Sequence, residues 1–580
     1  MSKSFHGAVL VAVMPVFLFG YSTGVLNAPE SVMFPSHTLG QWSTAVSSFC
    51  IGGIVGANVS GKLADKYGRR QCLLWFTGYL NTVAGLLHVI TPNMTGLIVG
   101  RVMVGLAGGA STVVTPMYLG EIAPPHIKGS IGTMTQLSVV LGIMASILVA
   151  LPFCTESQWR FIFVPLPVLS LVFVMCVPFL LPESPKWLLL NHYVSRGQEA
   201  KDTLKRFRAG GDSYDASDII EQEVELSLSG ILQESSTRNL DGVFQDTNDD
   251  DDEDDESAIS DEEIELCMNA PLDQNSDKNI SAHTMETTTS SESSRSSTSH
   301  EASQSSFRSF LSLPSNRIAF TSSILFPIAQ QLSGINALFY YSTTFFEGVI
   351  DNPHNGTVLA FFVNVLTTIL SLMFMDRFGR KTLLSWSAGG MLGCCILLTW
   401  VRVTTANEDG EVLLNNDNGE IDGRQGEEAV VSSSSSKYLI VLAVMLYITF
   451  FEIGLGSIPF FLASELIPSH FLGRVQSISF SANWTCNFLV GMLFPYMDKY
   501  LGAYSFVPFG VMLFGTALYA ICILPETRGK SLDDVMRELR GDSHERVDSN
   551  SNSMNNNNND DEAIALTPSH ENESSSTSIL

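Results

Sequence analysis

Long apolar stretches alternate with short charged connections along most of the chain. Each stretch is about 20 residues long, the length that an α-helix needs to cross a bilayer. A long polar region separates the first six from the last six. The twelve lie near Ala8–Leu26, Ser43–Gly61, Cys72–Ile90, Leu97–Tyr118, Ile131–Pro152, Phe161–Leu181, Ile318–Phe346, Val358–Met375, Leu383–Val401, Tyr438–Ala463, Val475–Met497 and Ser505–Leu524. The pattern predicts an all-α, polytopic membrane protein with about twelve transmembrane helices in two six-helix bundles.

The polar segments predict where these bundles begin and end. Residues 1–192 and 313–540 are expected to form the N-terminal and C-terminal bundles, the second with a polar outer insertion at 404–436. The loop at 193–312 is acidic and rich in serine, and the tail at 541–580 is polar. Neither can bury enough apolar surface to fold alone, so both are predicted to be largely disordered.

The net charge of −27 comes mostly from the central loop, because Ala209–Ser306 holds 26 acidic and 3 basic residues. The membrane part is therefore nearly neutral, and the charge indicates little about what the protein binds. The loop begins with a basic stretch, Gln198–Arg208, which is expected to form a short helix on the membrane surface. Its many serines could be sites for kinases or adaptors, while an unregulated polar linker is the simpler interpretation.

Lysine and arginine gather in every second connection, for example at Lys62–Arg70, Lys186–Arg208 and Arg377–Lys381. Cytoplasmic loops of membrane proteins carry an excess of positive charge. This asymmetry predicts that both termini and the central loop are cytoplasmic and that the insertion is outside. Because Met1–His6 lacks the charged region and the cleavage site of a removable signal, we expect a multi-pass protein, most simply of the plasma membrane.

The seventh apolar stretch contains a dense group of amides, including Gln330, Gln331 and Asn336. Amides within hydrocarbon are costly unless they face partners or a water-filled cavity. On a straight helix Gln331 and Asn336 would point about 140° apart, so a break at Gly334 is expected to turn them toward one cavity. Transporters bind substrates at such breaks, and uncharged donors and acceptors suit a neutral polyhydroxy solute. The alternative is that these amides join neighbouring helices.

Three motifs recur in the two halves of the chain in the same order. The pairs are GKLADKYGRR (61–70) with MDRFGRK (375–381), YLGEIAPPHIKG (118–129) with FLASELIPSHFLGR (461–474), and LPESPKWL (181–188) with LPETRGKSL (524–532). The repeat is in register once the insertion at 404–436 is removed. Parallel repeats of six spans are the architecture of transporters whose halves rock around a central site.

Each repeated motif mixes acidic and basic residues at a predicted cytoplasmic helix end. Opposite charges that are partly desolvated could latch the two halves together on the inner side and release them as they rock. The expected latch residues are Asp65, Arg69, Arg70, Arg101 and Glu121 in the first half, and Asp376, Arg380, Glu465 and Arg474 in the second. The alternative is that the basic residues only anchor the topology.

Other features of the sequence argue against catalysis. The nine cysteines are scattered, mostly in apolar stretches, and lack the spacing of a metal site. The sequence contains no nucleotide-binding loop and no constellation around a nucleophile. We therefore expect no enzyme activity, no cofactor and no nucleic-acid partner.

Four motifs, GRR (68–70), PESPKWL (182–188), QQLSGINALFYYS (330–342) and PETRGKSL (525–532), carry a resemblance to a known family. The chain resembles the facilitative glucose transporters of the sugar porter family, within the major facilitator superfamily. The resemblance covers all twelve stretches and excludes the acidic loop, the outer insertion and the tail. It implies the major facilitator fold and transport of a monosaccharide, such as the hexose glucose, across a lipid bilayer by facilitated diffusion with alternating access.

The resemblance also implies, position by position, which residues contact sugar. They are Gln136, Gln330, Gln331, Asn336, Asn364, Glu452, Phe460, Trp484 and Asn487, with Tyr340 and Tyr341 as an outer gate. Amides can pair with sugar hydroxyls as donor and acceptor, and aromatic faces can cover the C–H side of the ring. Phe460 stands where glucose carriers often have Trp, and Pro327–Ala329 where glucose-selective members have Gln-Leu-Ser. The choice among hexoses therefore stays open.

The first apolar stretch bears on energy coupling. In the family that this chain resembles, proton-coupled members typically carry an Asp in the first helix. This chain has Ser22 at that position, in FGYSTGV. A hydroxyl does not titrate near neutral pH, which favours uniport. Proton symport through another acid, chiefly Glu452, is an alternative. A non-transporting sugar sensor that signals through the acidic loop is another, although a sensor has no need of latch motifs.

Overall fold

The structure is a computed structural model, and it describes residues 2–540 apart from 28–31, 35–36, 125–126, 209–306, 308–309, 347–349, 351, 417–422 and 531. Most of the predicted acidic loop and the whole predicted tail therefore lie outside the described residues. Residues Met1–Arg540 form one compact unit. In its described part every regular element is a helix.

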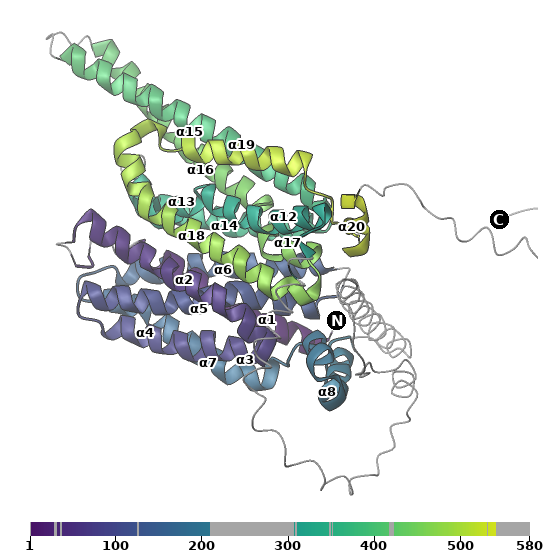
Figure 1. Ribbon diagram of the computed structural model, residues 1–580. Coiled ribbons are helices and arrows are strands. Elements are labelled where there is room, and N and C mark those ends of the chain that lie inside the picture. Colours follow the sequence, from purple (N-terminus) through teal and green to yellow (C-terminus); the bar gives the residue numbers. More distant parts are fainter. Residues whose placement is uncertain are drawn as a thin grey trace, which may run out of the picture. The chain divides into compact units, whose positions relative to one another are not determined.

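The helices of the first half follow the first six apolar stretches (Figure 1). Local signals set where several of them begin. Thr38 starts the second helix with a capping box, in which it exchanges two hydrogen bonds with Gln41. The elements are α1 (Lys3–Gly24), α2 (Leu39–Tyr67), α3 (Arg69–Leu73), η1 (Leu74–Leu80), α4 (Asn81–Ile90), α5 (Met94–Ile122), α6 (Lys128–Phe153), η3 (Trp159–Phe163), α7 (Pro165–Leu180) and α8 (Pro185–Arg208).

The second half repeats this arrangement, with two of its spans broken into shorter helices. Proline in the first turn, where a missing N–H loses no helical bond, opens α12, α14, α17 and α19. The elements are α12 (Pro314–Leu332), α13 (Ile335–Phe346), α14 (Pro353–Met375), α15 (Arg380–Asn416), α16 (Gly423–Ile453), α17 (Ile458–Leu466), α18 (Ser469–Leu501), η4 (Gly502–Tyr504), α19 (Val507–Cys522) and α20 (Leu532–Arg540).

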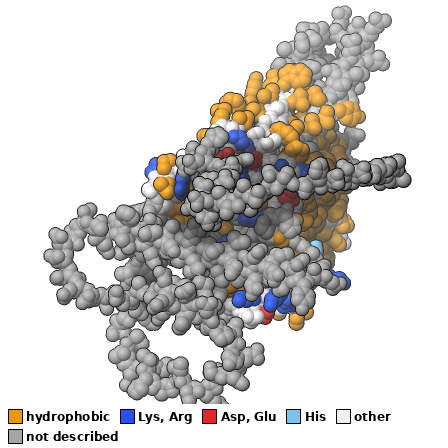
Figure 2. Space-filling view, turned by 90° about the vertical axis from the view of Figure 1, so that its right-hand side faces the viewer, with side chains coloured by type: hydrophobic (Ala, Val, Ile, Leu, Met, Phe, Trp, Pro, Cys, Tyr) orange, Lys and Arg blue, Asp and Glu red, His pale blue; other side chains and the backbone are white. Residues whose placement is uncertain are grey.

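Length and composition allow ten helical segments in the described part of the chain to cross a membrane. The stretch Phe471–Tyr504 and α19 satisfy the same requirement together and meet at 91°. All twelve predicted stretches lie on these elements, which confirms the predicted fold class. Large apolar side chains such as Leu10, Ile90 and Val511 are 68%, 71% and 66% exposed, and hydrophobic side chains gather on the described surface in Figure 2. Such a surface suits contact with lipid.

The polar insertion is more regular than a loop. α15 continues through it to Asn416, and α16 already begins at Gly423 (Figure 1). A helix that is already formed extends at far lower cost than a new one nucleates, which explains why polar residues prolong both spans. We name the end of the helices that carries 404–436 the insertion end. The opposite end, which carries Gly61–Arg70 and Met375–Lys381, is named the motif end.

Two helix pairs make the closest contacts between the halves, α2 with α18 and α6 with α14. Gly53 on α2 allows part of this approach, because a Cβ there would lie 2.3 Å from ring atoms of Trp484 on α18. The interface therefore brings together polar and aromatic side chains that lie hundreds of residues apart in the sequence.

The predicted break in the seventh span is present. α12 ends at Leu332 and α13 begins at Ile335, with Gly334 between them at a φ of +87°. This backbone conformation is favourable only for glycine. A Cβ at Gly334 would also lie 2.5 Å from the ring of Phe509, so the position needs glycine for two separate reasons.

We expect Gly334→Ala to destabilise the protein by about 1–3 kcal/mol, the usual cost of overpacking a close contact. Thermal unfolding of the detergent-solubilised chain would measure it. Gly389→Ala is the matched control, because a Cβ there meets nothing within 4 Å and alanine is favoured over glycine inside a helix. A melting temperature for Gly334→Ala equal to that of the control would contradict the role given to this break.

Candidate functional site

The break at Gly334 brings the expected amides together. Asn336 Nδ2 donates to Gln331 Oε1, and Gln331 Nε2 donates to Asn483 Oδ1 at 3.3 Å. Asn483 Nδ2 in turn donates to Gln330 Oε1 at 3.0 Å. Gln330, Gln331 and Asn483 are buried. We call these four residues, Gln330, Gln331, Asn336 and Asn483, the amide cluster.

Asn483 is a member of the cluster that the sequence analysis does not single out. A second bond, from its Nδ2 to the carbonyl of Pro327 at 2.7 Å, fixes it against α12. The available signal was its position directly before Trp484, one of the predicted sugar contacts. Asn483 therefore holds the ends of two glutamine side chains in place.

A second helix break adjoins the amide cluster. Gln330 Nε2 donates to the carbonyls of Leu455 and Gly456, at 2.9 and 3.0 Å. These carbonyls lie between α16 and α17, where the chain leaves the regular helix. Backbone groups freed by such breaks need partners within the membrane. Gln330 thus supplies a hydrogen-bond donor to the carbonyls of the second break, and it also lies beside the first break.

Glu452, at the end of α16, forms a bond between the two halves. Gln136 Nε2 on α6 donates to its two carboxyl oxygens at 2.9 and 3.2 Å. Glu452 is fully buried and Gln136 is 5% exposed. The sequence predicted both as sugar contacts, and the structure brings them together at the interface of the halves.

Asn364, on α14, stands out because it is fully buried while its side chain makes no bond. Neither its Oδ1 nor its Nδ2 has a hydrogen-bond partner among the described residues. A buried amide that is left unpaired costs about 1–3 kcal/mol. Buried polar groups are almost always paired with protein, water or ligand, which makes this amide a candidate contact for a polar ligand.

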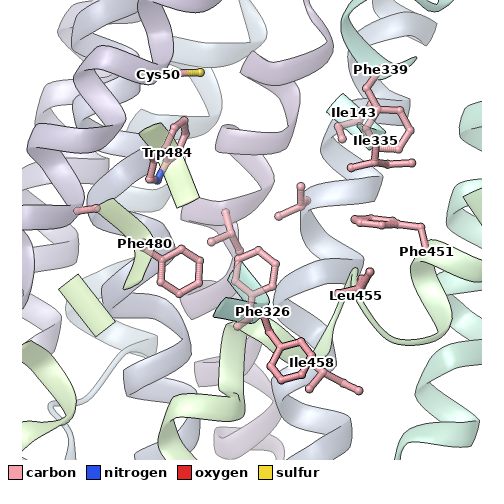
Figure 3. Packing of buried hydrophobic residues seen from close by; sticks show 14 of the residues in the cluster. Cys50, Ile143, Phe326, Ile335, Phe339, Phe451, Leu455, Ile458, Phe480 and Trp484 are labelled. Carbon is pink, nitrogen blue, oxygen red and sulfur yellow. The ribbon is translucent and has the colours of Figure 1, made fainter. Parts of the chain in front are cut away.

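Aromatic side chains cover the polar residues on the α18 side. Trp484 packs against Phe19 and Phe49 of the first half, with ring centroids 5.2 and 5.1 Å apart. Its Nε1 donates to Thr112 Oγ1 of α5 at 3.2 Å. Phe460 lies 5.4 Å from Phe480, measured between ring centroids. Figure 3 shows Trp484 and Phe480 within the buried cluster.

The two tyrosines that follow the break bind α18 toward the insertion end. Tyr340 donates its hydroxyl to Asn487 Oδ1 at 2.9 Å, and Tyr341 to the carbonyl of Gly491 at 2.8 Å. Nearby, Asn27 at the end of α1 donates to the Phe339 carbonyl at 2.7 Å. This last contact joins the halves, and no sequence motif singles out Asn27.

The arginines of the motif end are paired within each half. Arg69 lies 2.8 Å from Glu121 and 3.2 Å from Asp65, measured between nitrogen and oxygen. Arg380 lies 2.8 Å from Glu465 in the equivalent place. All three partners belong to the same half as their arginine, which corrects the expectation that these pairs themselves bridge the halves. The pairs instead fix the helix ends of each half.

Glu183 completes the first of these clusters and lies between α7 and α8. Burial raises the pKa of its carboxyl group, whereas hydrogen bonds from the backbone N–H groups of Ser184, Arg70 and Arg69, and the charge of Arg69, oppose that rise. Glu526 occupies the equivalent position in the second half, accepting from the Arg380 N–H at 2.8 Å. The repeat in the sequence is therefore also a repeat in hydrogen bonding.

Two aspartates contribute to the contacts between the halves at the motif end. The carboxylate of Asp65 lies against Gly473 in the first turns of α18, where a Cβ would be 2.5 Å away. Asp376 accepts from Ser130 Oγ in the first turn of α6. Negative charge is favourable at a helix N-terminus. Release of these two contacts would remove part of what joins the halves at this end.

Three predicted latch residues lie elsewhere than expected. Arg101 is a correction, because Glu121 is 20 residues further along the same helix, about 30 Å away. Its guanidinium donates to the carbonyls of Ser22 and Val46. Arg474 stacks on Phe307, with its Cζ 4.5 Å from the ring centroid, rather than pairing with Glu465. The side chain of Arg70 makes no hydrogen bond or ion pair with described residues, and it lines a separate cavity.

No group of three or more His, Cys, Asp or Glu side chains within the described residues is arranged to hold a metal ion. The helix breaks and interhalf contacts define a helical membrane protein with two repeated halves and a buried polar site rich in amides. The sequence profile of the Sugar (and other) transporter family matches residues 8–247 and 268–539. The chain belongs to that family, and the predicted resemblance is confirmed.

Individual relatives agree with this assignment. Solute carrier family 2, facilitated glucose transporter member 3 of Oryctolagus cuniculus is 30% identical over 564 residues, covering 93% of both chains. The protein of the same name from Mus musculus is 29% identical over 559 residues, again 93% of both. Among solved structures, the proton:xylose symporter XylE bound to 6-bromo-6-deoxy-D-glucose has a TM-score of 0.66 at 20% identity. The structural match covers 93% of this chain and 100% of the XylE chain, and it supports the major facilitator fold.

Proposed function

We propose that this protein carries a monosaccharide, a hexose such as glucose, across a membrane by facilitated diffusion with alternating access. Membership of a transporter family supports transport, and the names of its relatives support glucose as the sugar. The observation that carries the proposal is the amide cluster at the break of the seventh span. Asn364 on α14 adds a buried amide without a hydrogen-bond partner among the described residues. Uncharged amides, each both donor and acceptor, match the hydroxyl pattern of a sugar.

Binding would exchange one set of hydrogen bonds for another. Gln331 and Asn336 bond each other, so a sugar hydroxyl that replaces this bond gains little net energy. A sugar hydroxyl that reaches Asn364 would instead form a hydrogen bond with an amide that has no partner among the described residues. The aromatic rings of Trp484 and Phe460 would supply apolar cover for the sugar ring. Affinity is then set by Asn364 and the aromatic contacts more than by the paired amides.

Alternating access requires each end of the interface to open in turn. At the insertion end the halves are joined by hydrogen bonds from Asn27 to the Phe339 carbonyl and to Ser342. At the motif end they are joined through Asp376 with Ser130 and by Lys128 Nζ donating to the Ser464 carbonyl at 3.2 Å. We propose that these two sets of contacts break alternately while the pairs within each half persist.

Uniport is the form of transport that Ser22 supports. Its Oγ donates to the Leu18 carbonyl at 2.8 Å, and neither group titrates near neutral pH. Arg101 reaches the Ser22 carbonyl rather than a carboxylate. Proton symport is kept as the second candidate for one reason, which is that Glu452 is a fully buried acid at the interface.

We expect the carrier to equilibrate a non-metabolised hexose across vesicles without concentrating it. The measurement is steady-state accumulation in proteoliposomes with an imposed inward proton gradient, with and without an uncoupler. Glu452→Gln provides the matched variant, because it removes the only acid bonded to Gln136 in the described site. Accumulation above the outside concentration that collapses with the uncoupler and is lost in Glu452→Gln would replace uniport by symport.

We further propose that the motif end is cytoplasmic, with both chain termini, and that the protein resides in the plasma membrane. The excess of lysine and arginine at that end supports this orientation. Accessibility of N- and C-terminal epitope tags in intact cells tests it, and labelling without permeabilisation would reverse the assignment. The serines proposed as kinase or adaptor sites lie in the acidic loop, outside the described residues.

A further inference from the structure

A cavity of about 440 Å³ lies at the motif end of the first half, away from the amide cluster. Its walls come from the beginning of α1, from α3, from the end of α7 and from α8. Ser2 ties two of these walls together, because its hydroxyl donates to the Phe207 carbonyl at the end of α8. Phe5 and Phe207 add an edge-to-face contact with ring centroids 5.7 Å apart. The cavity is therefore held open by packed structure.

The acidic side chains of the cavity wall have hydrogen-bond or ion-pair partners, whereas its two arginine side chains have none among the described residues. Arg70 and Arg206 both line it, and neither side chain makes a hydrogen bond or ion pair with a described residue. The two carboxylates of the wall are already engaged. Glu199 pairs with Arg196 at 2.8 Å, and Asp202 accepts from the Gln198 amide at 3.2 Å. The cavity thus offers two free guanidinium groups to an anion.

The opposite wall is apolar and belongs to a membrane helix. Phe179 and Leu180, at the end of α7, line the cavity and are 82% and 44% exposed. Met175, one turn earlier on the same helix, is 66% exposed. An exposed apolar surface on a spanning helix faces acyl chains. One side of the cavity is therefore cationic, and the other is an apolar surface that contacts lipid. The cavity lies at the depth where the span α7 ends.

We propose that this cavity binds the phosphate group of a phospholipid whose acyl chains lie along Phe179 and Leu180. Guanidinium groups recognise phosphate through paired, charge-assisted hydrogen bonds. The Ser4 and Thr203 hydroxyls in the wall supply further donors. A soluble phosphate would use the same guanidinium groups but would gain nothing from the apolar wall. The lipid is therefore the occupant that both walls fit.

Equilibrium binding of a short-chain phosphatidic acid to the purified full-length protein in detergent tests this site. Arg206→Gln should weaken binding about tenfold or more, the cost of losing a hydrogen bond to a charged group. Lys205→Gln is the matched control, because it removes the same charge from the neighbouring position of α8 without lining the cavity. It should change binding less than about twofold, since it removes only long-range attraction. Unchanged thermal unfolding would show that both variants are folded.

Three outcomes would overturn the proposal. Equal losses in the two variants would mean general attraction to a basic surface. Binding of glycerol 3-phosphate as tight as that of the lipid would make a soluble phosphate the occupant. A rise of tenfold or more in lipid affinity after deletion of Asp241–Ser305 would mean that the acidic segment of the chain itself fills the cavity. Weaker binding in Arg206→Gln alone, together with preference for the lipid over its soluble headgroup, would support the site.

Discussion

Replacing Arg380 by alanine is expected to lower the free energy of unfolding by about 3–5 kcal/mol, the cost of leaving a buried charge without its partner. The side chains of Arg380 and Glu465 are only 6% and 10% exposed. Arg380 also donates to the Met375 carbonyl at 3.1 Å, so its loss leaves two acceptors short of a donor. Transport should slow because the end of the second half is no longer rigid. Equilibrium sugar binding, which uses the helix breaks, should change little.

Thermal unfolding and sugar exchange in proteoliposomes measure these effects. Arg377→Ala is the matched control, because this neighbouring arginine is exposed and carries the same charge. The double variant Arg380→Leu with Glu465→Leu should recover most of the lost stability, since it removes both charges. If Arg380→Ala were as stable and as active as Arg377→Ala, the arginine would be a topology anchor only.

Replacing Asn364 by leucine is expected to change stability and sugar affinity in opposite directions. The sugar-free protein should gain about 1–3 kcal/mol, because a buried amide without a partner gives way to an apolar side chain of similar size. Sugar binding should weaken about tenfold or more, because the same amide would gain its first partner from the sugar. Melting temperatures without sugar and sugar binding at equilibrium provide the two measurements.

Asn81→Leu separates this prediction from a general effect of removing buried amides. Asn81 is 2% exposed and its Oδ1 also has no hydrogen-bond partner among the described residues, but it lies on α4, outside the predicted site. Its replacement should leave sugar affinity unchanged. Unaltered affinity in Asn364→Leu as well would remove Asn364 from the sugar site and leave its unpaired amide as a reserve of strain.

The sequence by itself determined the fold class, the repeat of the halves and the broken seventh span. Hydrophobic runs of spanning length are decisive because a bilayer excludes unpaired backbone groups, so each such run becomes a helix. Gly334 could be predicted as the break because amides on both sides of it would otherwise face lipid. Family motifs such as PESPKWL then identified the family without any coordinates.

The tertiary structure decided which of these residues meet. Arg101 was assigned to the motif end by its charge, but its position along α5 places it about 30 Å from Glu121. Asn483 cannot be recognised from the sequence, because its partners belong to α12 and lie about 150 residues away in the chain. The interhalf contacts of Asp65 and Asp376 were likewise invisible, since sequence periodicity gives the face of a helix and not the neighbour it packs against. Contacts between segments hundreds of residues apart depend on how whole helices pack, and only the folded chain fixes them.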